Sequence, residues 1–265
     1  MISDPDPICS DGQERLRFRI SNPEDATAPT LVYLPGIHGD WTLVQAFRKA
    51  MSGRVRFVEI TYPRNPSWQL CDYAREIESG LASMGIQHGW LLGESFGSQV
   101  LWELTGRGQF RPDGLILAGG FVKYPLPWLL NLTRRICPSL SHRAVRRALP
   151  WYVAYARFRF AKSPESIQGA RDFAQRRTPA DHAAIVQRLD LIASNDPREI
   201  AATVRVPVHL LSGGIDPVVC WPWVSRWLRR HCPGLRGIRI IWPCDHTVLT
   251  TASEESAAQV RQWMS

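Results

Sequence analysis

The sequence predicts an α/β fold, with a mainly parallel, doubly wound sheet covered by helices on both faces. Seven short segments rich in valine, isoleucine and leucine, bounded by glycine or proline, are typical of buried strands. Between most of them, apolar residues recur every three to four positions, which indicates helices. Strands that alternate with helices favour parallel pairing, because a crossover helix returns the chain to the same end of the sheet.

The expected elements follow one another along most of the chain. The strands are expected at residues 16–20, 30–34, 55–60, 89–92, 114–118, 206–211 and 238–242. The clearest helical pattern covers 68–84, where one face carries an apolar residue every three to four positions. A last helix over 254–263 is expected to pack across the sheet.

One interval, 121–200, interrupts this alternation. It carries no strand pattern, and seven prolines divide it into helical stretches. Strand-like order resumes at 206–211. We therefore expect a core made of residues 1–120 and 201–265, with residues 121–200 forming a helical insertion after the strand that ends near Ala118.

Composition narrows the class of protein. A hydrophobic fraction of 45% and a charged fraction of 21% are ordinary for a globular domain. The first residues are acidic and proline-rich where a signal peptide needs basic and apolar ones, and no apolar run approaches the ~20 residues of a membrane span. These features predict a cytoplasmic location, with the six cysteines reduced. The sequence has no metal-ligand spacing and no nucleotide-binding motif, so we expect no metal and no cofactor.

The pentapeptide Gly93-Glu94-Ser95-Phe96-Gly97 is the strongest chemical signal. It follows the apolar run 90–92 directly and precedes a helical pattern, so it reads as a strand that turns sharply into a helix. Such a turn strains the backbone of the serine and exposes its hydroxyl group. Side chains in place of the two glycines would collide with the adjoining strand or helix. Ser95 is therefore the candidate nucleophile.

A serine hydroxyl needs a base to take its proton, and the base needs a carboxylate to orient it. Asp216 follows the expected strand at 206–211, and His246 follows the strand at 238–242. Both therefore lie at the carboxyl edge of the sheet, where the functional groups of open α/β sheets gather. The chain order Ser95, Asp216, His246 is the order expected with such a strand–turn–helix serine.

Other residues compete for these two roles. Asp190, Asp196 and Asp245 are the alternative acids, but they fall in a helix face, in a turn and next to the base, respectively. His38 is the competing histidine, in a loop where a histidine more often shapes the backbone. The chain has no acidic residue from position 119 to 164, which removes the position just after the strand ending at Ala118.

An acyl-transfer site also needs hydrogen-bond donors for the negative charge that develops on the substrate oxygen. One expected donor is the backbone N–H of Phe96, at the start of the helix. The other comes from the loop 35–40, whose glycines allow main-chain N–H groups to point into the site. We choose Ile37 as this donor, with His38 as the alternative.

With these parts in place, the chain resembles the α/β-hydrolase superfamily. The matching stretches are Leu34-Pro35-Gly36-Ile37-His38-Gly39, Gly93-Glu94-Ser95-Phe96-Gly97, Gly214-Ile215-Asp216-Pro217-Val218 and Asp245-His246. The likeness covers roughly 15–120 and 200–265. The interval 121–200 stands where members of this superfamily carry a variable helical lid. The oxyanion loop departs from the usual His-Gly pattern, since Pro35-Gly36 stands in that register.

The resemblance implies a serine-dependent acyl hydrolase, with carboxylic esters as the first expected substrates. Residues 121–180 carry twelve basic residues against two acidic ones, interleaved with aromatic residues. This pattern fits a solvated face over an apolar pocket, an attraction for an anionic acyl carrier, or contact with a lipid surface. Cleavage of acyl-CoA or carrier-protein thioesters is therefore the alternative, and a non-catalytic small-molecule binder is the alternative of another class.

We expect His38, Trp128 and Trp151 to line the substrate pocket. We expect no nucleic-acid partner, because no recognition module is visible.

Overall fold

The computed structural model describes residues 15–21, 27–140, 147, 149–151, 153–154 and 163–265 of the chain. Seven strands form one sheet in the order β1-β3-β2-β4-β5-β6-β7. All pairs are parallel except β1 with β3. In chain order the strands are β1 (Arg17–Ser21), β2 (Thr30–Leu34), β3 (Arg56–Thr61), β4 (His88–Glu94), β5 (Arg111–Ala118), β6 (Val208–Gly213) and β7 (Leu235–Ile241).

The prediction of a mainly parallel sheet with seven strands is confirmed, and every strand except β2 differs from its expected range by one to three residues at one or both ends. Strand β6 begins at Val208, because Pro207 has no N–H, and the N–H of Val208 makes the first bond, to the carbonyl of Gly234 (2.9 Å). Strand β7 begins at Leu235, three residues before the expected start, because it lies at the edge of the sheet, where its exposed residues break the apolar pattern.

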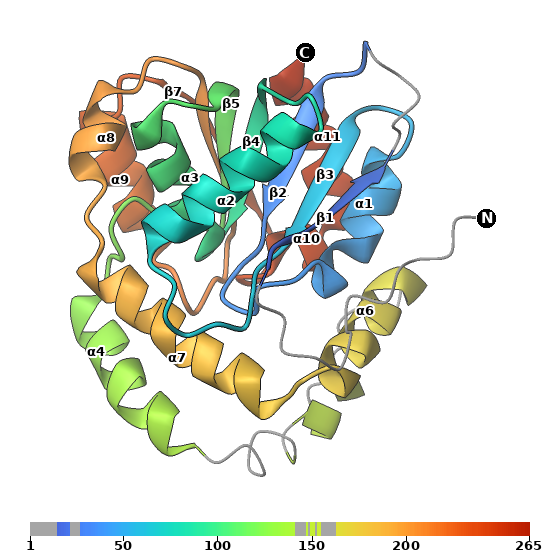
Figure 1. Ribbon diagram of the computed structural model, residues 1–265, viewed down its shortest axis with the longest axis vertical. Helices are drawn as coiled ribbons and strands as arrows, with labels where there is room; N and C mark the ends of the chain where they lie inside the picture. Colours follow the sequence, from blue (N-terminus) through green and yellow to red (C-terminus); the bar gives the residue numbers. More distant parts are fainter. Residues whose placement is uncertain (1–14, 22–26, 141–146, 148, 152, 155–162) are drawn as a thin grey trace.

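Helices cover both faces of this sheet (Figure 1). The helical elements are η1 (Thr42–Val44), α1 (Gln45–Met51), α2 (Leu70–Ser83), α3 (Gly97–Arg107), α4 (Pro127–Ile136), η2 (Cys137–Ser139), α6 (Pro164–Gln175), α7 (Pro179–Ser194), α8 (Arg198–Thr203), α9 (Trp221–His231), α10 (Val248–Thr251) and α11 (Ser253–Met264). The predicted helices at 68–84 and 254–263 correspond to α2 and α11.

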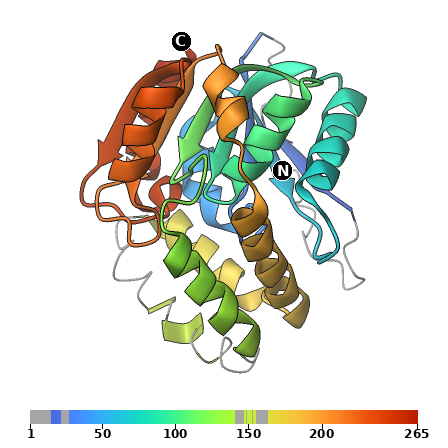
Figure 2. The same ribbon diagram turned by 90° about the vertical axis from the view of Figure 1, so that its left-hand side faces the viewer.

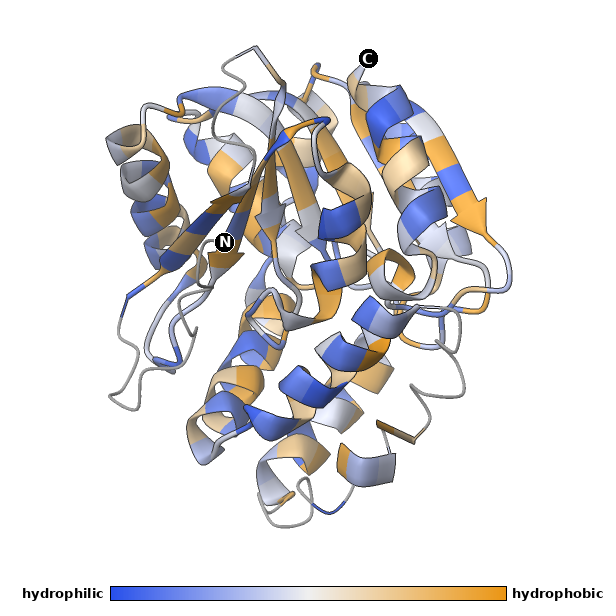
Figure 3. Cartoon of the chain, turned by 90° about the vertical axis from the view of Figure 1, so that its right-hand side faces the viewer, coloured by the Kyte–Doolittle hydropathy of each residue, from blue (hydrophilic) through white to orange (hydrophobic). Residues whose placement is uncertain are grey.

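Alternate residues of each central strand enter two separate hydrophobic cores. In β2, Val32 and Leu34 join the core under α2, α3, α8 and α9, whereas Leu31 and Tyr33 join the core under α1, α10 and α11. This division follows from the two-residue period of a strand, whose side chains point to opposite faces. The strands in the middle of the sheet are mostly hydrophobic, and the helices carry hydrophilic residues as well (Figure 3).

The segment between β5 and β6 contains no strand among its described residues. Helices α4, α6 and α7 lie beyond the ends of the strands, on one side of the sheet, whereas α8 packs against α3 (Figures 1 and 2). Helix α4 packs against α7, and α6 packs against η1 and α1. Helix α8 crosses the expected boundary between 200 and 201, and the division into a core and a lid stays a prediction.

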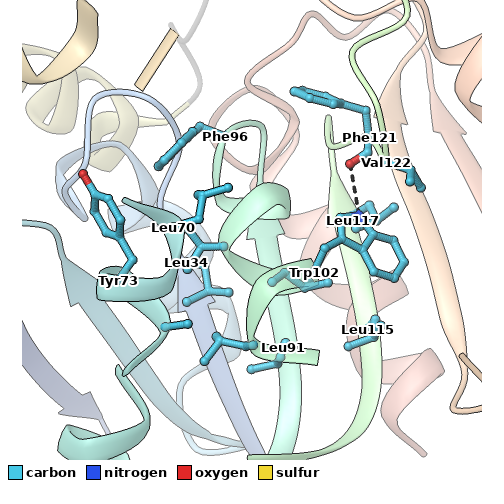
Figure 4. Packing of buried hydrophobic residues seen from close by; sticks show 14 of the residues in the cluster. Leu34, Leu70, Tyr73, Leu91, Phe96, Trp102, Leu115, Leu117, Phe121 and Val122 are labelled. Atoms are coloured by element: carbon cyan, nitrogen blue, oxygen red, sulfur yellow. Dashed lines mark hydrogen bonds between the residues drawn. The ribbon is translucent and has the colours of Figure 1, made fainter. Parts of the chain in front are cut away.

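Helix α3 holds both ends of this helical segment. The indole Nε1 of Trp102 donates a hydrogen bond to the carbonyl of Phe121 (3.1 Å; Figure 4), and the side chain of Gln99 donates to the carbonyls of Phe121 and Val122 (3.1 Å each). At the other end, the side chain of Asn195 donates to Oε1 of Gln99 (3.0 Å). The helix that begins beside Ser95 therefore anchors the segment just after β5 and again between α7 and α8.

Candidate active site

Ser95 stands on a strained turn between β4 and α3. Its φ of 49° lies in the left-handed region, and it is the one described residue other than glycine with a positive φ. Its N–H donates to the carbonyl of Ala118 at the end of β5 (3.0 Å). A Cβ on Gly93 would stand 2.9 Å from backbone atoms of Gly97, and one on Gly97 would stand 2.1 Å from the carbonyl oxygen of Leu34. The two glycines therefore allow the sharp turn, as the sequence pattern predicts.

Three side chains meet at the carboxyl edge of the sheet. The Ser95 hydroxyl oxygen lies 2.8 Å from Nε2 of His246, and Nδ1 of the same ring lies 2.8 Å from Oδ2 of Asp216. They come from loops that follow β4, β7 and β6, respectively. His246 can accept a proton from the serine at Nε2 when its Nδ1 hydrogen is held by the carboxylate.

Asp216 is held firmly in this arrangement. Its side chain is fully buried, and its Oδ1 accepts hydrogen bonds from the N–H groups of Val218 and Val219 (2.8 Å each). The second oxygen is thus left to His246. Hydrogen bonds of this kind fix the orientation of the carboxylate group.

The competing acids have other partners. Asp190 pairs with Arg134 (2.6 Å), and Asp196 pairs with Lys123 (2.7 Å) and with Arg198. Asp245 accepts hydrogen bonds from the N–H and the hydroxyl group of Thr247, two residues further on.

The loop 35–40 lies beside the start of α3. The N–H of Gly39 donates to the carbonyl of Gly36 (2.9 Å), and the N–H of Tyr62 donates to the carbonyl of Gly39 (2.8 Å). Within the described residues, the N–H groups of Ile37 and Phe96 donate to no backbone carbonyl. The Phe96 ring is buried between Tyr62 and Tyr73 (centroids 6.0 and 5.9 Å away; Figure 4 labels Phe96 and Tyr73), so its backbone has a defined position at the helix N-terminus.

The predicted pocket residues have different environments. His38 turns back onto its own loop, where its Nε2 lies 2.8 Å from the carbonyl oxygen of Asp40, and its ring lies edge-on to Phe173. Trp128 and Trp151 are 65% and 79% exposed. No hydrogen bond or ring contact within the described part of the chain joins either indole to Ser95 or His246. The role of all three in binding a substrate stays a prediction.

Buried charges surround the same loop. Burial alone would raise the pKa of the Asp40 carboxyl group, but the Arg177 guanidinium, His38 and the Thr42 hydroxyl hold this pKa well below its usual range. Glu94, next to the nucleophile, is buried and accepts a hydrogen bond from the hydroxyl of Tyr33. Burial first, and then the charge of Glu94, raise the pKa of Tyr33 well above its usual value.

Sequence reasoning missed the residues that hold the loop from behind. Arg188 of α7 is 2% exposed and donates to the carbonyl of Ile37 (2.8 Å), and Arg177 donates to the carbonyl of His38 (3.4 Å). A signal for Arg188 was present, because it occupies a position of α7 in line with the buried residues Ala184 and Leu191. A charged residue on the core-facing stripe of a helix indicates a specific buried partner.

Three further observations concern the described residues. None of the described helices is long and apolar enough to cross a membrane. In the same part of the chain, no three histidine, cysteine, aspartate or glutamate side chains are grouped so that they could hold a metal ion. Five cysteines are free thiols, and Cys9 lies outside the described residues.

Comparisons with known proteins give a match in structure only. No family model matches the sequence, and no curated protein matches it. The structure is similar to an enol-lactonase from Burkholderia xenovorans LB400 (TM-score 0.76, 17% identity, covering 94% of this chain and 96% of that one). It is also similar to a thermophilic esterase from Thermogutta terrifontis (TM-score 0.75, 16% identity, covering 94% of this chain and 92% of that one). A third similar structure is an esterase from Rhodococcus sp. ECU1013 (TM-score 0.73, 16% identity, covering 94% of each chain).

These likenesses extend over nearly the whole chain, and they show that it has the α/β-hydrolase fold. The resemblance inferred from the sequence motifs is thereby confirmed at the level of the fold. At identities of 14–17%, the comparison carries no assignment of substrate.

Proposed function

We propose that this protein is a serine hydrolase that cleaves carboxylic esters through an acyl-enzyme intermediate. The observation that carries the proposal is the unbroken chain of hydrogen bonds from Ser95 through His246 to Asp216, with 2.8 Å at each step. A nucleophile, a base and an orienting carboxylate in this geometry are the parts that nucleophilic acyl transfer requires.

The chemistry follows from these positions. Ser95 Oγ attacks the ester carbonyl carbon while His246 Nε2 takes its proton, and the carbonyl oxygen becomes an oxyanion. The N–H groups of Phe96 and Ile37 donate to this oxyanion. The intermediate then collapses, the alcohol leaves with the proton from Nε2, and the acyl group stays on Ser95. Water attacks the acyl-enzyme and gives a proton to the same nitrogen. The second intermediate then breaks its bond to Ser95 Oγ, which takes this proton back from Nε2, and the acid is released.

Carboxylic esters are the preferred substrate class for two reasons. The structurally similar proteins described above are named as esterases and as a lactonase, and a lactone is a cyclic ester. In addition, several basic residues that could attract an anionic carrier already have acidic partners. Lys123 pairs with Asp196 and Arg134 with Asp190, and these acids lie outside the basic stretch 121–180.

Thioester cleavage is the second candidate. Its support is the remaining basic excess, which includes Arg135 and Arg147, both exposed. An anionic acyl carrier or a lipid surface at this part of the protein is a proposal of the same standing.

A fluorophosphonate probe and a substrate panel test the proposal. We expect the wild type and Ser139→Ala, which changes an exposed serine of η2, to be labelled equally, and Ser95→Ala to be unlabelled. Aryl esters should be cleaved faster than acyl-CoA thioesters. A thioester preference that disappears in Arg135→Ser and Arg147→Ser would favour the second candidate. An unlabelled wild type would favour a non-catalytic binder.

A further inference from the structure

The helical segment places a buried arginine behind the proposed oxyanion loop. Arg188, in the middle of α7, is 2% exposed. Its Nη1 donates to the carbonyl of Ile37 (2.8 Å) and its Nη2 to the carbonyl of Pro63 (2.9 Å), while its Nε lies 3.4 Å from the hydroxyl oxygen of Tyr73. One guanidinium group thus joins α7 to the loops that follow β2 and β3.

The partners of this charge are unusual. A buried guanidinium is normally balanced by a carboxylate, but no ion pair within the described residues includes Arg188. Instead it bonds to main-chain carbonyls and lies 5.4 Å from the centre of the Tyr62 ring. The clearest structural effect of these hydrogen bonds is to fix the direction of the two carbonyl groups that Arg188 contacts.

The direction of the Ile37 carbonyl matters because a trans peptide unit is planar, with its C=O and N–H groups pointing in opposite directions. Arg188 holds the plane between Ile37 and His38 by its carbonyl, so it also sets the direction of the His38 N–H. The plane between Gly36 and Ile37 is held by the bond from the N–H of Gly39, which sets the direction of the Ile37 N–H. Because the two planes meet at the Cα of Ile37, both backbone angles of this residue are fixed.

Two further carbonyls of the loop also accept hydrogen bonds. Arg177 donates to the carbonyl of His38, and the N–H of Tyr62 donates to the carbonyl of Gly39. A Cβ on Gly39 would stand 2.4 Å from Nη1 of Arg188, so the loop and the guanidinium are in close contact. The carbonyls of residues 36–39 therefore all accept hydrogen bonds, while the N–H groups of Ile37 and His38 donate to no carbonyl within the described backbone.

We propose that Arg188 is a positioning residue that holds the oxyanion loop in its donating conformation. The inference rests on the proposed serine hydrolase activity and assigns α7 a part in it, because this helix carries the arginine that supports the loop. Arg188 does not touch the substrate, because it is buried behind the loop.

Arg188→Lys tests this directly. Lysine keeps the positive charge but cannot bond two carbonyls in a fixed fork, so Ile37 loses one of the two hydrogen bonds that fix its peptide planes. We expect kcat for an aryl ester to fall about 10- to 100-fold, because a small misplacement of a donor weakens the bond that forms in the transition state. KM should change less than about threefold, since the ester binds mainly through other contacts.

Two controls separate positioning from general damage. Arg134→Lys changes an arginine of α4 that pairs with Asp190 at the surface, and it should keep wild-type kcat. All rates are divided by the concentration of active sites, measured by stoichiometric fluorophosphonate labelling of Ser95. A variant that is merely less stable would lose active sites but keep its kcat per site, and that result would overturn the proposal.

A tetrahedral inhibitor gives a second readout. A boronic acid that forms an anionic adduct with Ser95 should lose affinity in Arg188→Lys by the same factor as kcat/KM, while an unreactive ether analogue of the ester should bind unchanged. Equal losses for both ligands would show that Arg188 shapes the pocket and not the loop.

A measurement on the wild type keeps the test independent of how the variants fold. On formation of the boronic acid adduct, the ¹⁵N signals of the Arg188 guanidinium should shift, and those of Arg134 should not. Unchanged Arg188 signals would overturn the proposal. Failure of the proposed function itself would look different: wild-type Ser95 would then react with neither the boronic acid nor the fluorophosphonate, and both proposals would fall.

Discussion

Gly97 and Leu34 are in direct backbone contact: a Cβ built on Gly97 would stand 2.1 Å from the Leu34 carbonyl oxygen. Gly97 opens the helix that follows Ser95, and Leu34 ends the strand that leads into the loop 35–40. The contact therefore sets the spacing between the proposed nucleophile and the proposed oxyanion donors. No rotation of a side chain can relieve a collision between a Cβ and a backbone oxygen.

The first prediction concerns this contact. In Gly97→Ala the strand and the helix must move apart, which displaces Ser95 from the loop. We expect kcat for an aryl ester to fall about 100-fold or more, and the protein to lose about 2 kcal/mol or more of unfolding free energy. Ester kinetics and urea unfolding of the purified variant measure the two effects.

Gly53→Ala is the matched control, because Gly53 has a φ of +71° but no heavy atom within 4 Å of the added Cβ. Only the backbone strain remains there, about 1 kcal/mol, and kcat should not change. Equal effects of the two variants on kcat would show that the contact with Leu34 does not place the nucleophile.

The second prediction is that Asp216→Asn disables the base through the wrong tautomer. Oδ1 of Asp216 accepts from two backbone N–H groups, so the single amide oxygen of asparagine will stay there and its NH₂ group will face His246. The imidazole must then accept at Nδ1 and carry its proton at Nε2, where it can no longer take the proton of Ser95.

We expect Asp216→Asn to lower kcat by about 10⁴ near pH 7, with little change in thermal unfolding. Asp190→Asn, at a surface acid that pairs with Arg134, should keep the wild-type rate. A loss of less than about tenfold in Asp216→Asn would mean that this carboxylate does not orient the base.

The sequence was sufficient to predict the strands and their order along the chain, because short apolar runs bounded by glycine or proline carry that information locally. It was also sufficient to nominate Ser95, Asp216 and His246, because the rigid turn at Ser95 has its own pattern and the other two follow strands. The ends of the strands were less predictable, as β6 and β7 illustrate. The start of β6 depends on Pro207, which has no N–H to donate to a neighbouring strand. The start of β7 depends on its position as an outer strand, which its own residues do not show.

The support of the oxyanion loop could not be predicted for a different reason. The carbonyls that Arg188 holds lie 151 and 125 positions away in the sequence. The place of Arg188 on the core-facing stripe of α7 indicates a buried partner, but the sequence does not show which distant carbonyls the fold brings to it. The same holds for Arg177, which counted as one of many basic residues but is buried against Asp40.

The third prediction concerns the ion pair between Asp40 and Arg177. The pKa of Asp40 is lowered in the folded state, so its carboxylate stabilises the fold at pH values above the unfolded pKa near 4, and this contribution is lost as pH falls toward the folded pKa. Asp40→Asn should therefore cost about 3 kcal/mol at pH 7, and the difference from the wild type should shrink below pH 4.

Urea unfolding at several pH values measures this difference. Asp113→Asn is the control, because Asp113 pairs with His88 at the surface (3.0 Å) and should contribute less than about 1 kcal/mol. A difference between Asp40→Asn and the wild type that stays constant from pH 7 to pH 3 would contradict the depressed pKa.

The fourth prediction concerns the anchor of the helical segment. Trp102 is fully buried and donates to the carbonyl of Phe121, which also accepts from Ser98 (3.0 Å) and Gln99 (3.1 Å). Trp102→Phe removes one of three bonds to this carbonyl and part of the packing, so we expect a loss of about 1–3 kcal/mol in urea unfolding. The same change at the exposed Trp128 should cost less than about 0.5 kcal/mol, and equal losses would contradict the anchoring role.

The last prediction is a pH dependence of stability at the opposite face of the sheet. His209 of β6 is stacked between Trp263 (centroids 4.5 Å apart) and Trp90 (5.8 Å). Burial, with a smaller contribution from the positive charge of Arg236, lowers the pKa of His209 to about 4. In the unfolded chain its pKa is about 6.5, so between pH 6.5 and pH 4 the unfolded state binds more protons and the fold loses stability as the pH falls.

In His209→Gln, which cannot take up this proton, the unfolding free energy measured in urea should fall less steeply over that range. Parallel curves for His209→Gln and the wild type would show that His209 titrates alike in both states.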